Sequence, residues 1–158
     1  MKEMFVAYLL PALWAFLACL GFGVVFNIHG VGILICGLGA GLGWLVYLLT
    51  MDVWGGDILS AFLAAVAVGA YSETVARVRR RPVTGYLQVA LLPLVPGSGV
   101  YHAMRYCVEG ETDLFITTLL HTFGFAAALS VGAMLVTSLL RALLPKFRRS
   151  LPQQGELN

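Results

Sequence analysis

Five long runs of apolar residues, each bounded by a short polar turn, constrain the fold of this chain more than any other feature. The runs cover residues 4–26, 31–49, 58–76, 83–108 and 114–140. A helix rises about 1.5 Å per residue, so roughly 20 residues cross the hydrocarbon core of a bilayer, and each run is near that length or longer. Because 59% of the chain is hydrophobic and only 11% is charged, we exclude a water-soluble core. The sequence predicts an all-α, polytopic integral membrane bundle of about five transmembrane helices.

The fourth apolar run contains an interruption. Pro93 and Pro96 remove backbone donors, and Gly97 and Gly99 remove the steric restraint that keeps a helix regular. A break at membrane depth is tolerated only where it is buried in protein or lines a watery cavity. We therefore expect the fourth transmembrane helix to stop at this Pro/Gly break and to restart after it.

A restarted helix presents free amide N–H groups and the positive end of its dipole, which together favour a carboxylate. Polar side chains follow the break at helical spacing and share one face of the new helix, up to Glu109. We expect the substrate-binding residues to be Pro96, Gly97, Ser98, Gly99, His102 and Arg105. A proline kink that serves only helix packing is the alternative, and the spacing does not choose between the two.

Three further residues are candidates for coupling or gating. Glu73 is the only carboxylate within the apolar runs, and intramembrane ionisable groups are usually functional. Its competing interpretation is an ion pair with Arg77 one helical turn later, which we favour. His121 fits equally well as a titrating group or as a hydrogen-bonding partner for nearby threonines. Asn27 lies in the turn after the first run.

Close helix packing is predicted for the second run, which carries four glycines. Gly37 with Gly41, and Gly39 with Gly43, each have the spacing of two small residues separated by three others. This spacing lets another helix approach backbone to backbone. It indicates tight packing and nothing more specific.

The basic residues gather in two clusters, the loop 77–82 and residues 141–149. Two crossings separate the clusters, so both lie on the same side of the membrane. The positive-inside rule then places the loop 77–82 and the C-terminus in the cytoplasm, with the acidic turns and the N-terminus outside. A four-helix chain would move the N-terminus inside and is the weaker option. We expect a transmembrane domain over 1–145 and a basic, disordered cytoplasmic tail over 146–158.

Other chemistries are not favoured. Ser98 and His121 resemble an intramembrane serine protease dyad, but Pro96 replaces the expected first glycine and no third group orients the histidine. The three histidines lack metal-ligand spacing, and no cofactor fingerprint is present. Clusters of basic residues at the ends of apolar runs are orientation signals, so we predict no nucleic-acid binding. The sequence predicts no catalytic residue, no metal site and no cofactor.

Three segments resemble the membrane half of the threonine/serine exporter family (ThrE type). They are residues 21–27, reading GFGVVFN, residues 72–82, reading SETVARVRRRP, and residues 92–104, reading LPLVPGSGVYHAM. The resemblance covers residues 21–140, and its most specific part is the proline-glycine-serine block followed by Tyr101 and Met104. The chain is most similar to the small membrane subunit of the split form of this family.

The resemblance implies a multi-pass protein of the cell inner (plasma) membrane that works with a larger homologous subunit carrying a cytosolic domain. It implies export of a small carboxylate, either threonine and serine or a dicarboxylate such as succinate. It transfers no role to single residues. Five helices enclose little space, which also points to a partner or an oligomer. The competing hypothesis is a non-transporting membrane scaffold or assembly subunit.

Overall fold

The computed structural model describes residues 2–143, and this part of the chain is helical with no strand. The elements are α1 (Lys2–Val25), α2 (Val31–Trp54), α3 (Asp57–Arg79), α4 (Val83–Leu91), the short 3-10 helix η1 (Leu92–Leu94), α5 (Gly97–Glu109) and α6 (Thr112–Leu143). Four helices are long and apolar enough to cross a membrane, and the number is five if Val83–Leu94 and Gly97–Glu109, which are bent by 50° at the break, form one span. The predicted all-α polytopic bundle with an interrupted fourth crossing is confirmed. The predicted tail at 146–158 lies outside the described residues.

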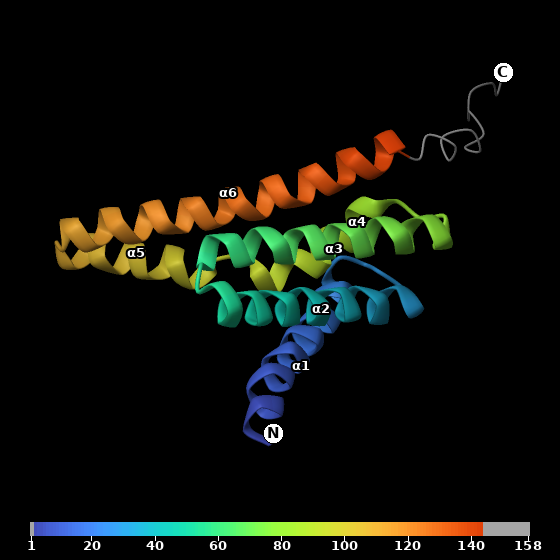
Figure 1. Ribbon diagram of the computed structural model, residues 1–158, viewed down its shortest axis with the longest axis horizontal. Coiled ribbons are helices and arrows are strands. Elements are labelled where there is room, and N and C mark those ends of the chain that lie inside the picture. The colour runs from blue at the N-terminus through green and yellow to red at the C-terminus, as the bar shows by residue number, and fades with distance from the viewer. Residues whose placement is uncertain (1, 144–158) are drawn as a thin grey trace.

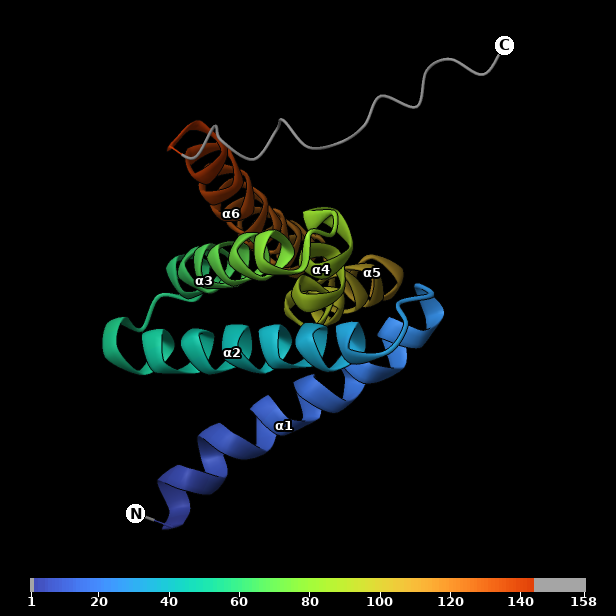
Figure 2. The ribbon, with the colours of Figure 1, turned by 90° about the vertical axis from the view of Figure 1, so that its right-hand side faces the viewer.

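The helices form layers that follow the order of the chain. Figure 2 shows α1, α2, α3 and α6 stacked one on the next, with α4 beside α3 and next to α2. Before the break, α4 packs on α2 and α3, whereas after the break α5 packs on α6. The bend therefore moves the chain from one set of neighbours to another.

The topology gives the bundle two chemically different ends (Figure 1). The basic end contains the α1–α2 turn, the α3–α4 loop and the end of α6. The acidic end contains the α2–α3 and α5–α6 turns, and α5 and α6 extend beyond the α2–α3 turn there. Arg79 and Arg81 lie at the basic end, and Asp57 begins α3 at the acidic end.

The glycines of α2 face two different neighbours. A Cβ atom added at Gly37 would lie 2.8 Å from the ring of Phe16 in α1, and Gly41 faces the same helix. On the other side, a Cβ atom at Gly43 would overlap Val68 of α3. The two predicted small-residue pairs therefore let α2 pack closely on α1 with one face and on α3 with the other.

Candidate functional site

The break in the fourth crossing borders a cavity of about 260 Å³ near the acidic end. One wall is the break itself, and the others come from α2, the first turn of α3 and α6. The lining residues are Trp44, Tyr47, Asp57, Pro93, Leu94, Val95, Pro96, Ser98, Gly99, His121, Thr122 and Phe125. Three of the predicted binding residues, Pro96, Ser98 and Gly99, therefore line one cavity with His121, which the spacing had not grouped with them.

The start of α5 offers two backbone donors at this cavity. The Gly97 N–H donates to the Val95 carbonyl at 2.7 Å, and the first helical bond runs from the Val100 N–H to the Pro96 carbonyl at 3.3 Å. The amides of Ser98 and Gly99 come between the Gly97 and Val100 amides in the chain, before the first i to i−4 hydrogen bond of α5. No side chain caps this helix start. They are oriented with the positive end of the α5 dipole and can bind an anion.

Gly99 also fixes how closely α5 approaches α6. A Cβ atom at Gly99 would overlap the hydroxyl of Thr122. Thr122 is buried, and its hydroxyl donates to the Thr118 carbonyl at 2.7 Å. A Cβ atom added at Gly97, two residues earlier, would have no neighbouring atom within 4 Å. The two glycines therefore have different roles, and only Gly99 is required by close packing.

Three helices contribute a polar cluster opposite these amides. The Tyr47 hydroxyl of α2 donates to Asp57 Oδ1, and His121 Nε2 of α6 lies 3.5 Å from Asp57 Oδ2. The side chains of Asp57 and His121 are 29% and 53% exposed, so solvent reaches the pair. Both also line a second cavity of about 570 Å³ beside Phe62. The pair therefore stands between two cavities.

Trp44 supplies a further donor in the same cavity wall. Its indole Nε1 is buried and has no hydrogen-bond partner in the described part of the chain. The Trp44 and Tyr47 ring centroids are 5.7 Å apart, which packs the indole beside the polar cluster. A buried donor of this kind is costly unless it is paired, so the site has a donor available for a bound oxygen.

Three predicted binding residues, Gly97, His102 and Arg105, do not line the cavity. The Arg105 Nε donates to Glu109 at 2.8 Å, and both side chains are about half exposed. His102 Nδ1 lies 2.7 Å from the Ser98 carbonyl, and its ring packs edge-on against Tyr101. His102 and Arg105 share the predicted helix face with Ser98, but only Ser98 borders the cavity. Their role in binding stays a prediction.

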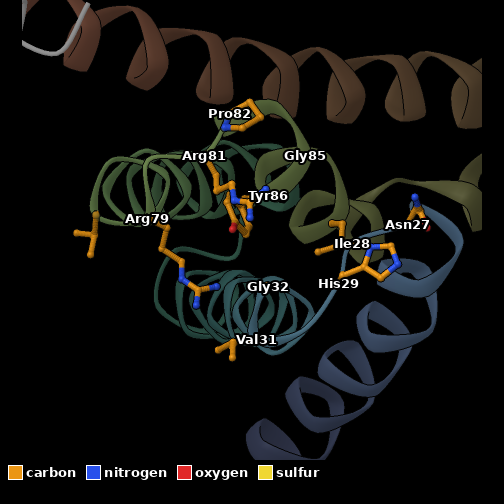
Figure 3. A pocket seen from close by; sticks show the side chains of 11 residues that line it. Asn27, Ile28, His29, Val31, Gly32, Arg79, Arg81, Pro82, Gly85 and Tyr86 are labelled. Atoms are coloured by element: carbon orange, nitrogen blue, oxygen red, sulfur yellow. The ribbon is translucent and has the colours of Figure 1, made fainter. Parts of the chain in front are cut away.

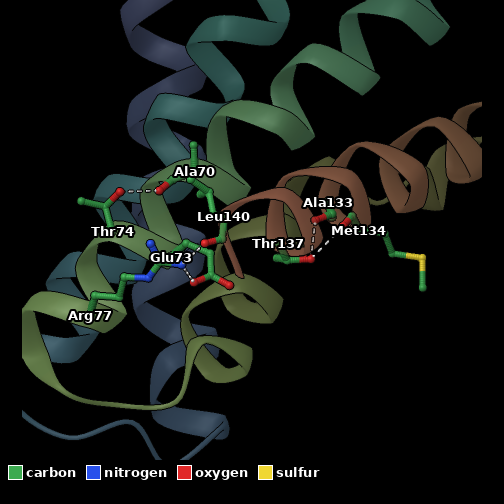
Figure 4. Close-up of polar contacts among 8 residues, drawn as sticks. All are labelled: Ala70, Glu73, Thr74, Arg77, Ala133, Met134, Thr137 and Leu140. Atoms are coloured by element: carbon green, nitrogen blue, oxygen red, sulfur yellow. Dashed lines mark hydrogen bonds and ion pairs between the residues drawn. The ribbon is translucent and has the colours of Figure 1, made fainter. Parts of the chain in front are cut away.

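Glu73 forms the ion pair favoured by its spacing. Its Oε2 lies 3.2 Å from Arg77 Nη2, which also donates to the Leu140 carbonyl of α6 at 3.0 Å (Figure 4). Glu73 is only 2% exposed, so the carboxylate is buried between helices. The pair ties α3 to the end of α6 near the basic end. A coupling role for Glu73 remains a prediction.

Asn27 lies far from the break. It adopts a left-handed backbone conformation, with φ 57°, in the α1–α2 turn. It lines a cavity of about 700 Å³ at the basic end together with His29, Arg79 and Arg81 (Figure 3). The predicted gating candidates therefore occupy three separate places, because Glu73, His121 and Asn27 line no common cavity.

The spacing did not single out Trp44, Tyr47, Asp57 or Thr122 as site residues. The sequence placed Asp57 only in an acidic turn, and Tyr47 lies inside an ordinary apolar run. The available signal was the position of Asp57 at the start of an apolar run, where its carboxylate is held by the helix dipole. Its partners come from two other helices.

These features define a class of protein. It is a multi-pass α-helical membrane protein in which a broken helix presents free amides to a cavity, an arrangement found in membrane transporters. The chain belongs to the threonine/serine exporter family, because the family model described as "Threonine/Serine exporter, ThrE" matches residues 11–139. The match includes the break and all the cavity-lining residues. No curated protein and no solved structure matched the chain. The predicted family is confirmed, and it assigns the chain an exporter-type transport role.

Proposed function

We propose that this chain is the membrane subunit of a two-component exporter that moves serine and threonine out of the cell. The larger homologous subunit with a cytosolic domain is its partner. The basic end lies in the cytoplasm and the acidic end outside, in the inner (plasma) membrane, because basic loops remain on the cytoplasmic side. The family match and the cavity at the break support this proposal.

The single observation that carries the substrate assignment is that the cavity offers groups for both charges of an amino acid. The amides of Ser98 and Gly99 bind the carboxylate, with the Trp44 indole as a further donor. The Asp57 carboxylate binds the ammonium group. A dicarboxylate would place its second negative charge near Asp57. The cavity therefore favours serine and threonine over succinate.

The size of the cavity agrees with this substrate class. Its volume is about 260 Å³, whereas pockets for drug-sized ligands span roughly 300–1,000 Å³. A small metabolite fits, and a peptide does not.

The Asp57–His121 pair places a second group at the carboxylate that binds the ammonium. His121 Nε2 lies 3.5 Å from Asp57 Oδ2, so the imidazole competes with the substrate ammonium for the same carboxylate. Contact with His121 and contact with substrate then oppose each other.

A partner is needed to close the site. Ser98 and His121 are exposed although they line the cavity, so this chain covers only part of it. The outer face of α1 also exposes large apolar side chains, including Leu13 and Trp14. Lipid and the larger subunit are the partners proposed for these surfaces.

Reconstituted vesicles test the function. Vesicles that hold this chain and the larger subunit are compared with vesicles that hold the larger subunit alone, using labelled serine, threonine and succinate. We expect serine and threonine efflux only when both chains are present, with succinate efflux much slower. Equal efflux without this chain would identify it as a scaffold or assembly subunit. Faster efflux of succinate than serine would reject the assignment of Asp57.

A further inference from the structure

The cavity at the basic end is lined by cationic side chains and by no carboxylate. It lies between the α1–α2 turn and the α3–α4 loop, has a volume of about 700 Å³, and is bordered by His29, Arg79, Arg81 and Tyr86 (Figure 3). In the figure the Arg79 side chain extends from α3 toward α2. Elements distant in the chain therefore bring basic groups to one place.

The basic groups are available to a ligand. In the described part of the chain the arginine ion pairs are those of Arg77 and Arg105, and no hydrogen bond or ion pair engages the side chains of Arg79, Arg81 or His29. All three are exposed. Two guanidinium groups with no internal counter-ion leave the cavity with a charge of at least +2, which an anion neutralises.

Backbone donors add to these side chains. Helix α2 starts at Val31 without a side-chain cap, and its first backbone bond is donated by Ile33 to the Gly30 carbonyl at 3.2 Å. The amides of Val31 and Gly32 precede that bond, and both residues line the cavity. A Cβ atom at Gly32 would lie 3.7 Å from the Tyr86 hydroxyl, so this hydroxyl borders the same helix start.

We propose that this cavity binds a phosphate group, supplied either by the headgroup of an anionic phospholipid or by inorganic phosphate. Arginine forks match phosphate geometry, and amides at a helix start bind phosphate oxygens. The site lies at the basic end of a membrane bundle, where cationic pockets between helices meet lipid headgroups. This proposal is separate from the transport site, because the two cavities share no lining residue.

Two binding arms separate the two sources of phosphate. In the first, the full chain is placed in vesicles of phosphatidylglycerol and phosphatidylcholine in equal parts, and the motionally restricted fraction of each spin-labelled lipid is measured. In the second, inorganic phosphate is titrated by calorimetry against the chain in a neutral detergent. Preference for phosphatidylglycerol alone identifies a headgroup site, and phosphate binding in detergent identifies a free-phosphate site. Either result supports the proposal.

The variants Arg79→Gln and Arg81→Gln test the site, and Arg80→Gln is the matched control. Arg80 carries the same charge in the same loop but does not line the cavity. We expect each cavity variant to weaken binding about tenfold or more, since a charged hydrogen bond is lost. The control variant should change the affinity by no more than about twofold, because Arg80 lies outside the cavity and salt screens its charge.

A filling variant covers the case in which an arginine variant fails to fold. Gly85 lines the cavity and has no atom within 4 Å of an added Cβ, so Gly85→Leu fills space without a clash. Gly85→Leu should abolish the preference for phosphatidylglycerol and the binding of inorganic phosphate, although every charged side chain is kept. The proposal is overturned if neither probe binds, if Arg80→Gln weakens binding as much as the cavity variants, or if serine displaces the probe.

Discussion

The cavity at the break and the cavity at the basic end differ in the signs of charge that they present. The cavity at the break is lined by the Asp57 carboxylate and the start of α5, whereas the cavity at the basic end is lined by arginines and by no carboxylate. The first suits a molecule with both charges, and the second suits a simple anion. An uncapped helix start is therefore common to the two proposed sites, and the side chains beside it distinguish the ligand proposed for each.

The largest expected effect concerns the contacts that join α3 to α6 near the basic end. Arg77→Met removes the ion pair to buried Glu73 and the bond to the Leu140 carbonyl. We expect a loss of about 3–5 kcal/mol in the free energy of unfolding, as for other buried pairs that lose one partner. Denaturant unfolding in detergent measures it. Arg80→Met is the control, and an equal loss there would show that loop charge, not the pair, matters.

Asp57→Asn tests whether serine binds in the cavity at the break and not in the cavity at the basic end. Loss of the ammonium-binding charge should raise the apparent KM for serine about tenfold to a hundredfold in two-chain vesicles. The same variant should reduce the difference between the efflux rates of serine and succinate. Asp52→Asn, at the same end of the bundle but outside the cavity, and Arg81→Gln, at the other end, should leave the serine KM unchanged. A higher serine KM in all three variants would contradict the assignment of Asp57 as the ammonium-binding residue.

Gly99→Ala tests the close approach of α5 to α6. The added methyl overlaps the Thr122 hydroxyl, so we expect a loss of about 1–3 kcal/mol in the free energy of unfolding together with reduced serine efflux. Gly97→Ala meets open space and should change stability by less than about 1 kcal/mol. Thermal unfolding of the two variants side by side gives the answer. Equal stabilities would mean that the helices separate easily at this point.

The smallest effect concerns the contact between His121 and Asp57. His121 Nε2 lies 3.5 Å from Asp57 Oδ2, so His121→Gln removes a group that competes with the substrate ammonium for this carboxylate. We expect the apparent KM for serine to fall about threefold, equivalent to less than about 1 kcal/mol. His102→Gln, outside the cavity, should leave the serine KM unchanged. Initial efflux rates from two-chain vesicles over a range of serine concentrations measure the KM, and an unchanged value in His121→Gln would show that the histidine does not compete.

Local features were readable from the sequence. The apolar runs predicted the long helices, and the prolines and glycines located the break between η1 and α5. The pair Glu73 and Arg77 is one helical turn apart, so its contact follows from helix geometry alone. The glycine spacing in α2 predicted close packing, although not which helix each face meets.

Contacts between helices were decided only by the tertiary structure. Asp57 meets Tyr47 and His121 because three helices bring their side chains together, and nothing in the spacing of these residues relates them. Helical spacing placed His102 on the face of Ser98, but the 50° bend and the packing of Gly99 against α6 leave only Ser98 at the cavity. The sequence by itself located the helices and the break, since these depend on neighbours within one turn, although α2 runs to Trp54, past the predicted end at residue 49. Which faces meet depends on how whole helices rotate and cross, and packing alone sets that.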